Sequence, residues 1–342
     1  MRPFQYIRAD SPQAAIVGFG NANESDGSDE RSRGSQYLAG GTTLMDLMKL
    51  GVMQPSAVID INSLPTDNLG QIELGPRGLR LGAMVRMSDA AEHPDIIERY
   101  PVIAQSLSLA ASTQIRNMAS LGGNVLQRTR CTYFRDTSYP DCNKRSPGSG
   151  CAAMDGINRA HAVLGISGDC IASYPGDFAQ ALTALDAQVE INGRNGARVV
   201  PFATLHRVPG NTPNVEHTLA PGDLIIAFEI PETPFARRSL FLKIRDRESY
   251  EFALASAAVA LDLDDGTVRD ARIALGGVAT VPWRSQEAEA KLKGRKLDED
   301  ALAEAADAAF AEASPRKHNA FKIELGKRTL ARALQQAAAL EI

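Results

Sequence analysis

The chain has 342 residues, of which 44% are hydrophobic, 23% are charged and 6% are aromatic, and its formal net charge at pH 7 is -4. These values are typical of a soluble globular protein with two or three domains, and they exclude collagen-like, disordered and supercharged chains. The acidic balance argues against nucleic-acid binding, and membrane insertion is not expected because no apolar stretch reaches the roughly 18 residues of a spanning helix.

The N-terminal part of the chain predicts a small unit of strands and helices. Residues 1–6 contain no apolar core or cleavage site of a secretory signal, so the chain is expected to carry no export signal of its own. Residues 11–17 are typical of a capped helix start, and residues 20–34, which lack any large apolar side chain, predict a solvated loop. Residues 37–44 read as a strand that runs into two glycines and then into a helix.

The middle of the chain predicts mixed helices and strands. Residues 79–83 alternate like a strand. Residues 189–191 and 197–200 predict two further strands, with a turn at Asn192-Gly193 between them. The apolar segment 224–228 is followed by a proline-containing stretch near 231–238, where we expect a separate domain to begin.

The last third of the chain predicts a hairpin followed by helices. Residues 252–263 and 268–275 read as two strands joined by a turn at 264–266. Residues 298–313 and 319–340 carry the apolar periodicity of helices. Because strands and helices occur in separate runs, the pattern favours an α+β fold over a doubly wound sheet.

All four cysteines fall in one segment, with ten, eight and eighteen residues between successive members: Cys131, Cys142, Cys151 and Cys170. The prolines and glycines between them predict a loop that can turn several ligands inward. Two disulfides, a structural zinc and an iron-sulfur cluster are all compatible with four thiols. Zinc sites usually bring cysteines in closely spaced pairs, which are absent here, so the spacing favours a cluster over zinc. His161, the only histidine among the cysteines, is a candidate ligand or hydrogen-bond donor.

Two glycine loops could hold a phosphate group. Residues 39–44 and 119–124 each place two adjacent glycines where backbone N–H groups can turn toward an anion. Two such loops suit a diphosphate held from both sides. Neither matches the dinucleotide or P-loop fingerprints, and each taken singly is also compatible with an ordinary turn.

These loops, together with Gln114-Ile115-Arg116-Asn117, resemble the paired flavin-binding loops of the FAD-binding (medium) subunit of the xanthine dehydrogenase and carbon monoxide dehydrogenase family of molybdenum hydroxylases. The resemblance runs the length of the chain. Its other motifs follow in the family's order: Phe4-Gln5-Tyr6, Asp60-Ile61, Ala184-Leu185-Asp186-Ala187, Phe228-Glu229-Ile230-Pro231 and Ala274-Leu275-Gly276-Gly277-Val278-Ala279.

The resemblance implies a noncovalent, extended FAD whose diphosphate lies on both loops. It places Asp177 near the adenosine half, and it places Lys243 and an apolar side chain, Ile226, near the isoalloxazine. The alternative interpretations are a helix N-cap for Asp177 and a solvated strand edge for Lys243. The remaining residues that the resemblance assigns to the cofactor lie in and beside the two loops: Ala39, Gly40, Gly41, Thr42, Thr43, Leu44, Asn117, Ser120, Leu121, Gly122, Gly123 and Asn124.

The resemblance also implies the domain organisation. A two-part FAD-binding region of the PCMH type is expected over 1–62 and 63–232, followed by a C-terminal α+β domain over 233–342 with a small antiparallel sheet and helices. The chain departs from the common pattern by an insertion at about 126–172 that carries all four cysteines. This insertion resembles the one in the subset, especially bacterial aldehyde oxidoreductases, whose FAD subunit holds a [4Fe-4S] cluster.

The function implied is that of an electron-transfer subunit in a heterotrimeric aldehyde oxidoreductase. Its partners would be a large molybdenum-cofactor subunit and a small [2Fe-2S] subunit, and the FAD would pass electrons to an external acceptor. No catalytic residue is assigned in this chain. A relative acting on an aromatic acyl-CoA or an N-heterocycle, a stand-alone flavin oxidase and a zinc scaffold are the alternatives. The protein is expected in the cytoplasm or, if exported together with a partner subunit, in the periplasm.

Overall fold

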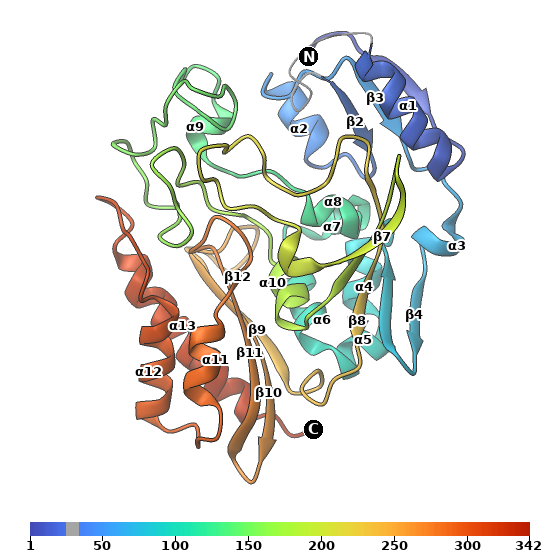
Figure 1. Cartoon of the computed structure of the whole chain (residues 1–342). Helices are drawn as coiled ribbons and strands as arrows, with labels where there is room; N and C mark the ends of the chain where they lie inside the picture. Colours follow the sequence, from blue (N-terminus) through green and yellow to red (C-terminus); the bar gives the residue numbers. More distant parts are fainter. Residues whose placement is uncertain (25–33) are drawn as a thin grey trace.

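The computed structural model describes residues 1–24 and 34–342, and its N-terminal part is a three-stranded parallel sheet with the order β1-β3-β2 (Figure 1). The central strand, β3 (Ala57–Asp60), is buried at its first three residues and pairs with β1 (Gln5–Arg8) and β2 (Ser35–Leu38). Parallel neighbours need crossover connections, which the helices α1 (Pro12–Glu24) and α2 (Leu44–Lys49) provide.

Helix α1 begins where the sequence predicts, because the Ser11 hydroxyl accepts a hydrogen bond from the Ala14 N–H at 3.2 Å. It ends later than predicted. Residues 20–24 belong to the helix rather than to a loop, since Phe19 packs on the Tyr37 ring with a centroid distance of 4.9 Å and keeps the helix against the sheet. The rest of the predicted loop, residues 25–33, lies outside the described residues.

A five-stranded antiparallel sheet follows, with the order β4-β5-β8-β6-β7. Its strands are β4 (Ile72–Gly75), β5 (Gly78–Gly82), β6 (Gln188–Gly193), β7 (Gly196–Pro201) and β8 (Leu224–Pro231). The predicted strands are confirmed, but the turn between β6 and β7 lies at residues 194–195 and not at Asn192-Gly193. Gly193 still pairs with Gly196, whose φ of +98° suits glycine at the end of a tight turn.

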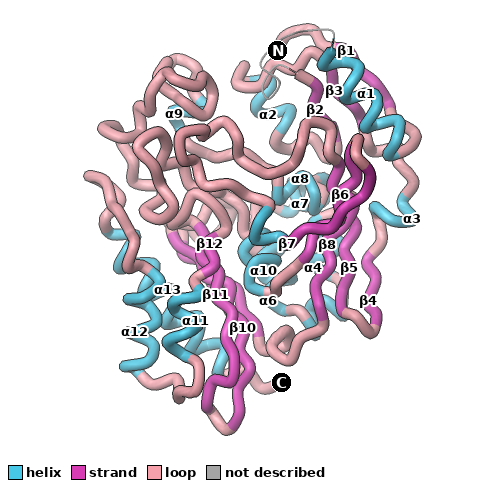
Figure 2. The backbone as a smooth tube through the Cα atoms, in the orientation of Figure 1, coloured by secondary structure: helices cyan, strands magenta, loops and turns pink. Residues whose placement is uncertain are grey.

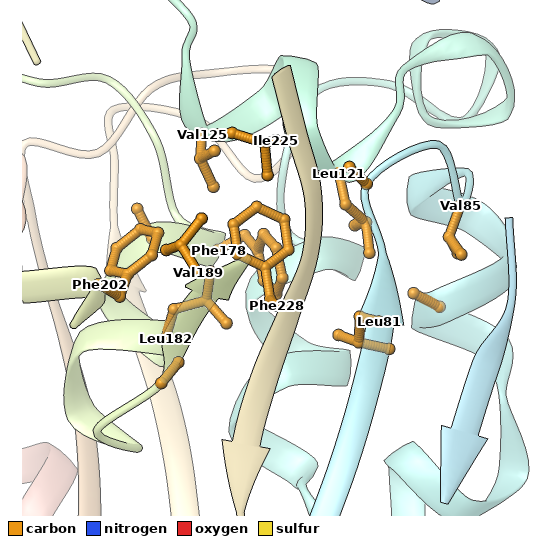
Figure 3. Packing of buried hydrophobic residues seen from close by; sticks show 14 of the residues in the cluster. Leu81, Val85, Leu121, Val125, Phe178, Leu182, Val189, Phe202, Ile225 and Phe228 are labelled. Carbon is orange, nitrogen blue, oxygen red and sulfur yellow. The ribbon is translucent and has the colours of Figure 1, made fainter. Parts of the chain in front are cut away.

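Short helices pack around this sheet and carry the second glycine loop (Figure 1). They are α3 (Thr66–Leu69), α4 (Met87–Glu92), α5 (Pro94–Arg99), α6 (Pro101–Ser108), α7 (Thr113–Met118), α8 (Leu121–Val125), α10 (Phe178–Ala184) and the 3-10 turn η1 (Phe202–Thr204). Figure 3 shows the core between them, where Phe178 of α10 meets Phe228 of β8 edge to face at 5.8 Å. Leu121 and Val125 of α8 are fully buried beside this core, which fixes α8 against the sheet.

The cysteine-bearing insertion is almost entirely loop, as predicted (Figure 2). Between residues 126 and 172, all of which are described, α9 (Thr132–Arg135) is the one helix. Cys142 and Cys151 form an isolated antiparallel bridge within the loop. Arg135 ties one side of the loop to Asp46 of α2, with an N–O distance of 2.8 Å.

The C-terminal part is a four-stranded antiparallel sheet with the order β12-β11-β10-β9, covered on one face by helices (Figure 1). The predicted hairpin is confirmed, although its first strand begins at residue 255 rather than 252. The elements are β9 (Ser239–Ile244), β10 (Ala255–Asp264), β11 (Thr267–Gly276), β12 (Trp283–Arg284), α11 (Gln286–Leu292), α12 (Glu299–Ala309) and α13 (Phe321–Ala338).

The start of α13 also anchors the insertion. Lys322 is fully buried, and its ammonium donates hydrogen bonds to the carbonyls of His161 at 3.0 Å and Gly277 at 2.6 Å. Just before the helix, the Asn319 amide donates to the Ala162 carbonyl at 3.0 Å. Buried carbonyls need such partners, so these two side chains hold the loop segment 160–162 in place. None of the helices in the described part of the chain combines the length and the apolar character that crossing a membrane requires.

Candidate functional site

The first glycine loop presents a row of free backbone amides. It connects the end of β2 to the start of α2, and Gly41 turns the chain with a φ of +73°. No hydrogen bond to another described residue is donated by the N–H groups of residues 40–44. Five consecutive unsatisfied amides are costly unless a ligand or solvent accepts from them, so the loop is suited to an anion.

The second glycine loop is built differently from the prediction. The Leu121 and Gly122 amides donate to the carbonyls of Val85 and Ala83, and the Gly123 amide donates to the Ser120 hydroxyl at 3.2 Å. Within residues 119–124, all of which the structure describes, only the Ser120 N–H makes no hydrogen bond. The second loop therefore offers one free amide to an anion, whereas the first offers five. The two loops would thus contribute unequally to holding a diphosphate.

The two loops touch each other at Gly40. A Cβ on Gly40 would lie 1.9 Å from the Met118 carbonyl oxygen and 3.1 Å from the Ala119 Cα. No side chain fits at that separation, so glycine is required where the first loop meets the entry to the second.

Both loops line one cavity of about 320 Å³, which is within the usual size range of cofactor sites. The side chains of Val125 and Ile225 connect its wall to the hydrophobic core that Figure 3 shows. The wall of the cavity, including the two loops, comes from segments far apart in the sequence: residues 36–44, 83–84, 119–129, 170–175 and 206–225. A cavity with free amides at one place and both apolar and polar side chains elsewhere suits a ligand that combines a diphosphate with aromatic rings.

The four cysteines come together as predicted around a second, small cavity of about 10 Å³. All four are free thiols. Burial raises the pKa of Cys131 to about 12 and that of Cys170 to about 11, so both thiols are neutral unless a nearby cation compensates. Cys170 also lines the large cavity, so it borders both.

As they stand in the described part of the chain, no three or more histidine, cysteine, aspartate or glutamate side chains are arranged so that they could hold a metal ion. His161 is a polar neighbour of the thiols, and its Nε2 lies 3.1 Å from the Cys131 sulfur. Burial and the nearby Lys322 lower the pKa of His161 to about 4, so its ring is neutral.

Comparison with known families assigns the chain to a family. A family described as the FAD-binding domain in molybdopterin dehydrogenase matches residues 2–233. The chain belongs to the FAD-binding medium subunits of the molybdenum hydroxylases. The C-terminal domain of the carbon monoxide dehydrogenase flavoprotein matches residues 241–337, so the two family matches together account for nearly the whole chain.

Individual relatives agree with this assignment. The chain is 43% identical to the FAD-binding subunit PaoB of an Escherichia coli aldehyde oxidoreductase, over 99% of each chain. It is 24% identical to the medium chain of a glyceraldehyde dehydrogenase from Sulfolobus acidocaldarius, over 91% of this chain and 89% of that one. A chain of carbon monoxide dehydrogenase from Hydrogenophaga pseudoflava superimposes with a TM-score of 0.74 at 26% identity, covering 99% of each. The protein is thus the flavoprotein subunit of an oxidoreductase of the molybdenum hydroxylase family, with the expected mixed α and β fold.

The large cavity brings together most of the residues that the family resemblance assigned to the cofactor. Those that line it are Ala39, Gly40, Gly41, Thr42, Thr43, Leu44, Ser120, Gly122 and Gly123. Asn117, Leu121 and Asn124 are not among its lining residues. Asn117 lies on the exposed side of α7, Leu121 is fully buried in the core, and the Asn124 amide donates to the Met87 sulfur at 3.3 Å.

Asp177 and Lys243 lie side by side in the structure. The Lys243 ammonium lies 2.6 Å from a carboxylate oxygen of Asp177, and the Lys243 and Asp177 side chains are 1% and 4% exposed. Neither residue lines the large cavity, so their expected contacts with the two halves of FAD remain a prediction. Lys243 is too buried for a solvated strand edge, and Asp177 holds the N-cap position of α10 without a side-chain capping bond.

Ile226 does not line the large cavity, whereas its neighbours on β8, Leu224 and Ile225, do. Ile226 is the extra residue of a β-bulge, because Ala227 and Ile225 pair with the consecutive residues Glu190 and Ile191 of β6. The sequence pattern contains no signal for this one-residue shift.

Sequence reasoning missed a charged cluster at the wall of the large cavity. Arg128 and Lys144 both form ion pairs with Glu216, the lysine at 2.9 Å, and all three line the cavity. Burial opposes ionisation of Glu216, but the two cations outweigh it and lower its pKa to about 2. The cluster joins the insertion to the segment before β8, a contact that no local motif reveals.

Aromatic side chains at the same cavity were also missed. The hydroxyl of Tyr174 and Nε2 of His206 both donate to the Val125 carbonyl, each at 2.9 Å. Burial lowers the pKa of His206 to about 4, so its ring stays neutral and Nε2 carries the proton. Elsewhere on the cavity wall, the Tyr37 hydroxyl donates to the Gly222 carbonyl at 2.8 Å. These bonds fix the shape of the cavity around the end of α8.

Proposed function

We propose that this protein is the FAD-binding electron-transfer subunit of a heterotrimeric, molybdenum-containing aldehyde oxidoreductase, and that its insertion holds a [4Fe-4S] cluster. The observation that carries the proposal is that Cys170 borders both the FAD cavity and the cavity that the four cysteines share. The relative with 43% identity is named as an aldehyde oxidoreductase subunit, which supports aldehydes as the substrates of the complex.

The chain's own residues would act by binding and shielding the cofactor. FAD supplies reversible acceptance of one or two electrons when bound. We assign the diphosphate to the free amides of residues 40–44 and the Ser120 N–H, because these are unsatisfied donors on the cavity wall. Val125 and Ile225 contribute apolar surface that excludes water. The buried pair of Lys243 and Asp177 joins β9 to the start of α10.

Four thiols around one cavity match a [4Fe-4S] cluster in kind and number. Each thiolate binds a different iron in such a cluster, so the sulfurs stand farther apart than around one ion. The cavity of about 10 Å³ has room for about one water molecule, so the loop must widen to accept a cluster. We assign Cys131, Cys142, Cys151 and Cys170 as its ligands.

The division into 1–62, 63–232 and 233–342 remains part of this proposal. The composition of the sheets supports it, because each of the three sheets draws all its strands from one of these parts. A large molybdenum-cofactor subunit and a small [2Fe-2S] subunit would supply the substrate chemistry and the first electron-transfer steps. The acceptor that takes electrons from FAD is external to the chain.

The test is an absorption spectrum of anaerobically purified protein before and after dithionite, with flavin identified and iron and sulfide counted. FAD with about four irons per chain is expected. Stoichiometric zinc without iron would overturn the cluster, and aldehyde or alcohol turnover by the chain alone would overturn the subunit role. Assays of the complex with aldehydes, aromatic acyl-CoA thioesters and N-heterocycles decide the substrate class.

Variants separate the two cofactors. Cys151→Ser should lose iron and retain FAD, and iron retained at full occupancy would mean that Cys151 is not a ligand. A bulky residue at Gly41, where φ is +73°, should expel FAD. Gly123 tolerates a Cβ 3.0 Å from the Ser120 hydroxyl, so only a side chain larger than alanine should expel FAD there.

A further inference from the structure

Two of the four cysteines face each other across a short piece of antiparallel backbone. The Asn143 amide donates to the Gly150 carbonyl at 2.7 Å, and the Ala152 amide donates to the Asp141 carbonyl at 2.9 Å. These two bonds flank Cys142 and Cys151, which makes the cysteines a non-hydrogen-bonded pair of the bridge. In such a pair the Cα atoms lie about 4.5 Å apart and the side chains project to the same face.

A disulfide needs a Cα separation of roughly 4.4 to 6.8 Å with both Cβ atoms on one side. The backbone at Cys142 and Cys151 meets this requirement without rearrangement. Cys131 and Cys170 line the same cavity, but no backbone bridge pairs either of them with another cysteine within the described part of the chain. The backbone of the loop therefore selects Cys142 and Cys151 as the pair, in addition to bringing all four cysteines close together.

The surroundings hold this bridge in register. The Asn143 side chain accepts from the Gly150 amide at 2.8 Å and donates to the Asp169 carbonyl at 3.1 Å. The Cys142 amide donates to the Ser149 hydroxyl at 3.0 Å. Cys142 is buried, whereas Cys151 is partly exposed and is the thiol that a reagent reaches first.

We propose that Cys142 and Cys151 form a reversible disulfide, and that this oxidation and iron binding by the same thiols exclude each other. The oxidant is a small-molecule disulfide of the glutathione type. The Cys151 thiolate attacks one of its sulfurs and releases one thiol, and the Cys142 thiolate then displaces the second. The reagent S–S bond is reduced to two thiols, the two protein thiols become one S–S bond, and each protein thiol gives up its proton.

The second half of this inference rests on the proposed cluster, and the first half does not. A sulfur held in a disulfide cannot act as a thiolate ligand, so the oxidised loop retains at most two of the four ligands. Loading of iron would then require a thiol reductant, which would make the insertion responsive to the redox poise of its compartment.

The test uses the full chain, stripped of iron by a chelator under reducing conditions and then treated with glutathione disulfide. Trypsin can cut after Arg130, Arg135, Lys144, Arg145 and Arg159, which places each cysteine on a separate peptide. Mass spectrometry should find the peptide 136–144 linked to the peptide 146–159. A link that involves Cys131 or Cys170 in place of this one, or glutathione adducts without an internal link, would overturn the pairing.

Matched variants guard against an indirect effect. The double variant Cys131→Ser/Cys170→Ser should still form the link, and Cys142→Ser should not, with retained FAD showing that each chain is folded. Loss of the link in the double variant would contradict the pairing. Iron and sulfide uptake are then compared in oxidised and thiol-reduced wild type. We expect iron uptake only after reduction. Equal uptake by the oxidised and the reduced protein would refute the exclusion. If neither form takes up iron although the disulfide forms, the cluster and the exclusion are refuted, but the pairing of Cys142 with Cys151 is not.

Discussion

Replacing Gly40 with alanine tests whether the contact between the two glycine loops sets FAD affinity. The added Cβ would lie 1.9 Å from the Met118 carbonyl oxygen. Real Cβ contacts begin near 3.0 Å, so the two loops must separate by about 1 Å. Overpacking of this kind costs about 1–3 kcal/mol, and because the free amides of residues 40–44 move with the loop, we assign that cost to the FAD-bound state. FAD should therefore bind roughly 5- to 150-fold more weakly.

The affinity is measured by calorimetric titration of FAD-free protein with FAD, alongside thermal unfolding of the FAD-free variant. Gly75→Ala is the matched control, because nothing lies within 4 Å of a Cβ at that position and it does not line the cavity. It should bind FAD like the wild type. If Gly40→Ala also binds FAD with unchanged affinity, the close approach to Met118 does not set the spacing of the loops, and the assignment of the diphosphate to this place is wrong.

Three further predictions concern the buried charges. The Glu216 carboxylate stabilises the fold by roughly 3 kcal/mol above about pH 4.5, and this contribution is lost as the pH falls toward its folded-state pKa of about 2. Acid denaturation of Glu216→Gln should therefore depend less on pH in that window than acid denaturation of the wild type. Lys243→Met leaves Asp177 buried without its cation and should lower the free energy of unfolding, measured in urea, by about 3–5 kcal/mol. The double variant Lys243→Met/Asp177→Leu should regain most of this loss, and additive losses in it would show that the two charges are not coupled. Lys322→Met removes the donor to the 161 and 277 carbonyls and should speed tryptic cleavage in the insertion while FAD affinity is unchanged, and equal cleavage rates would refute the anchoring role.

Much of the fold follows from local sequence signals. The apolar strand 224–228, the hairpin after residue 252 and the capped start of α1 are all present because each is specified by neighbouring residues. The extension of α1 to Glu24 was not predictable, because it depends on packing of Phe19 against a ring 18 residues later in the chain. Composition alone therefore misassigned residues 20–24.

The proposed diphosphate site was predictable where backbone amides form it. Glycine pairs mark places where amides can face a ligand, and the loop at 39–44 lines the cavity as expected. The second loop shows the limit, since hydrogen bonds to Ala83 and Val85 use its amides, and those partners come from another element. The pairing of Asp177 with Lys243 and the cluster around Glu216 join residues at least 66 positions apart, so only the tertiary structure reveals them.

The anchoring of the insertion by Asn319 and Lys322 has a consequence for how the protein is made. The ribosome delivers residues 126–172 roughly 150 residues before the start of α13. Until that helix emerges, the carbonyls of residues 161 and 162 lack the donors that hold them. The cysteine loop can therefore reach its final shape only after nearly the whole polypeptide has been synthesised.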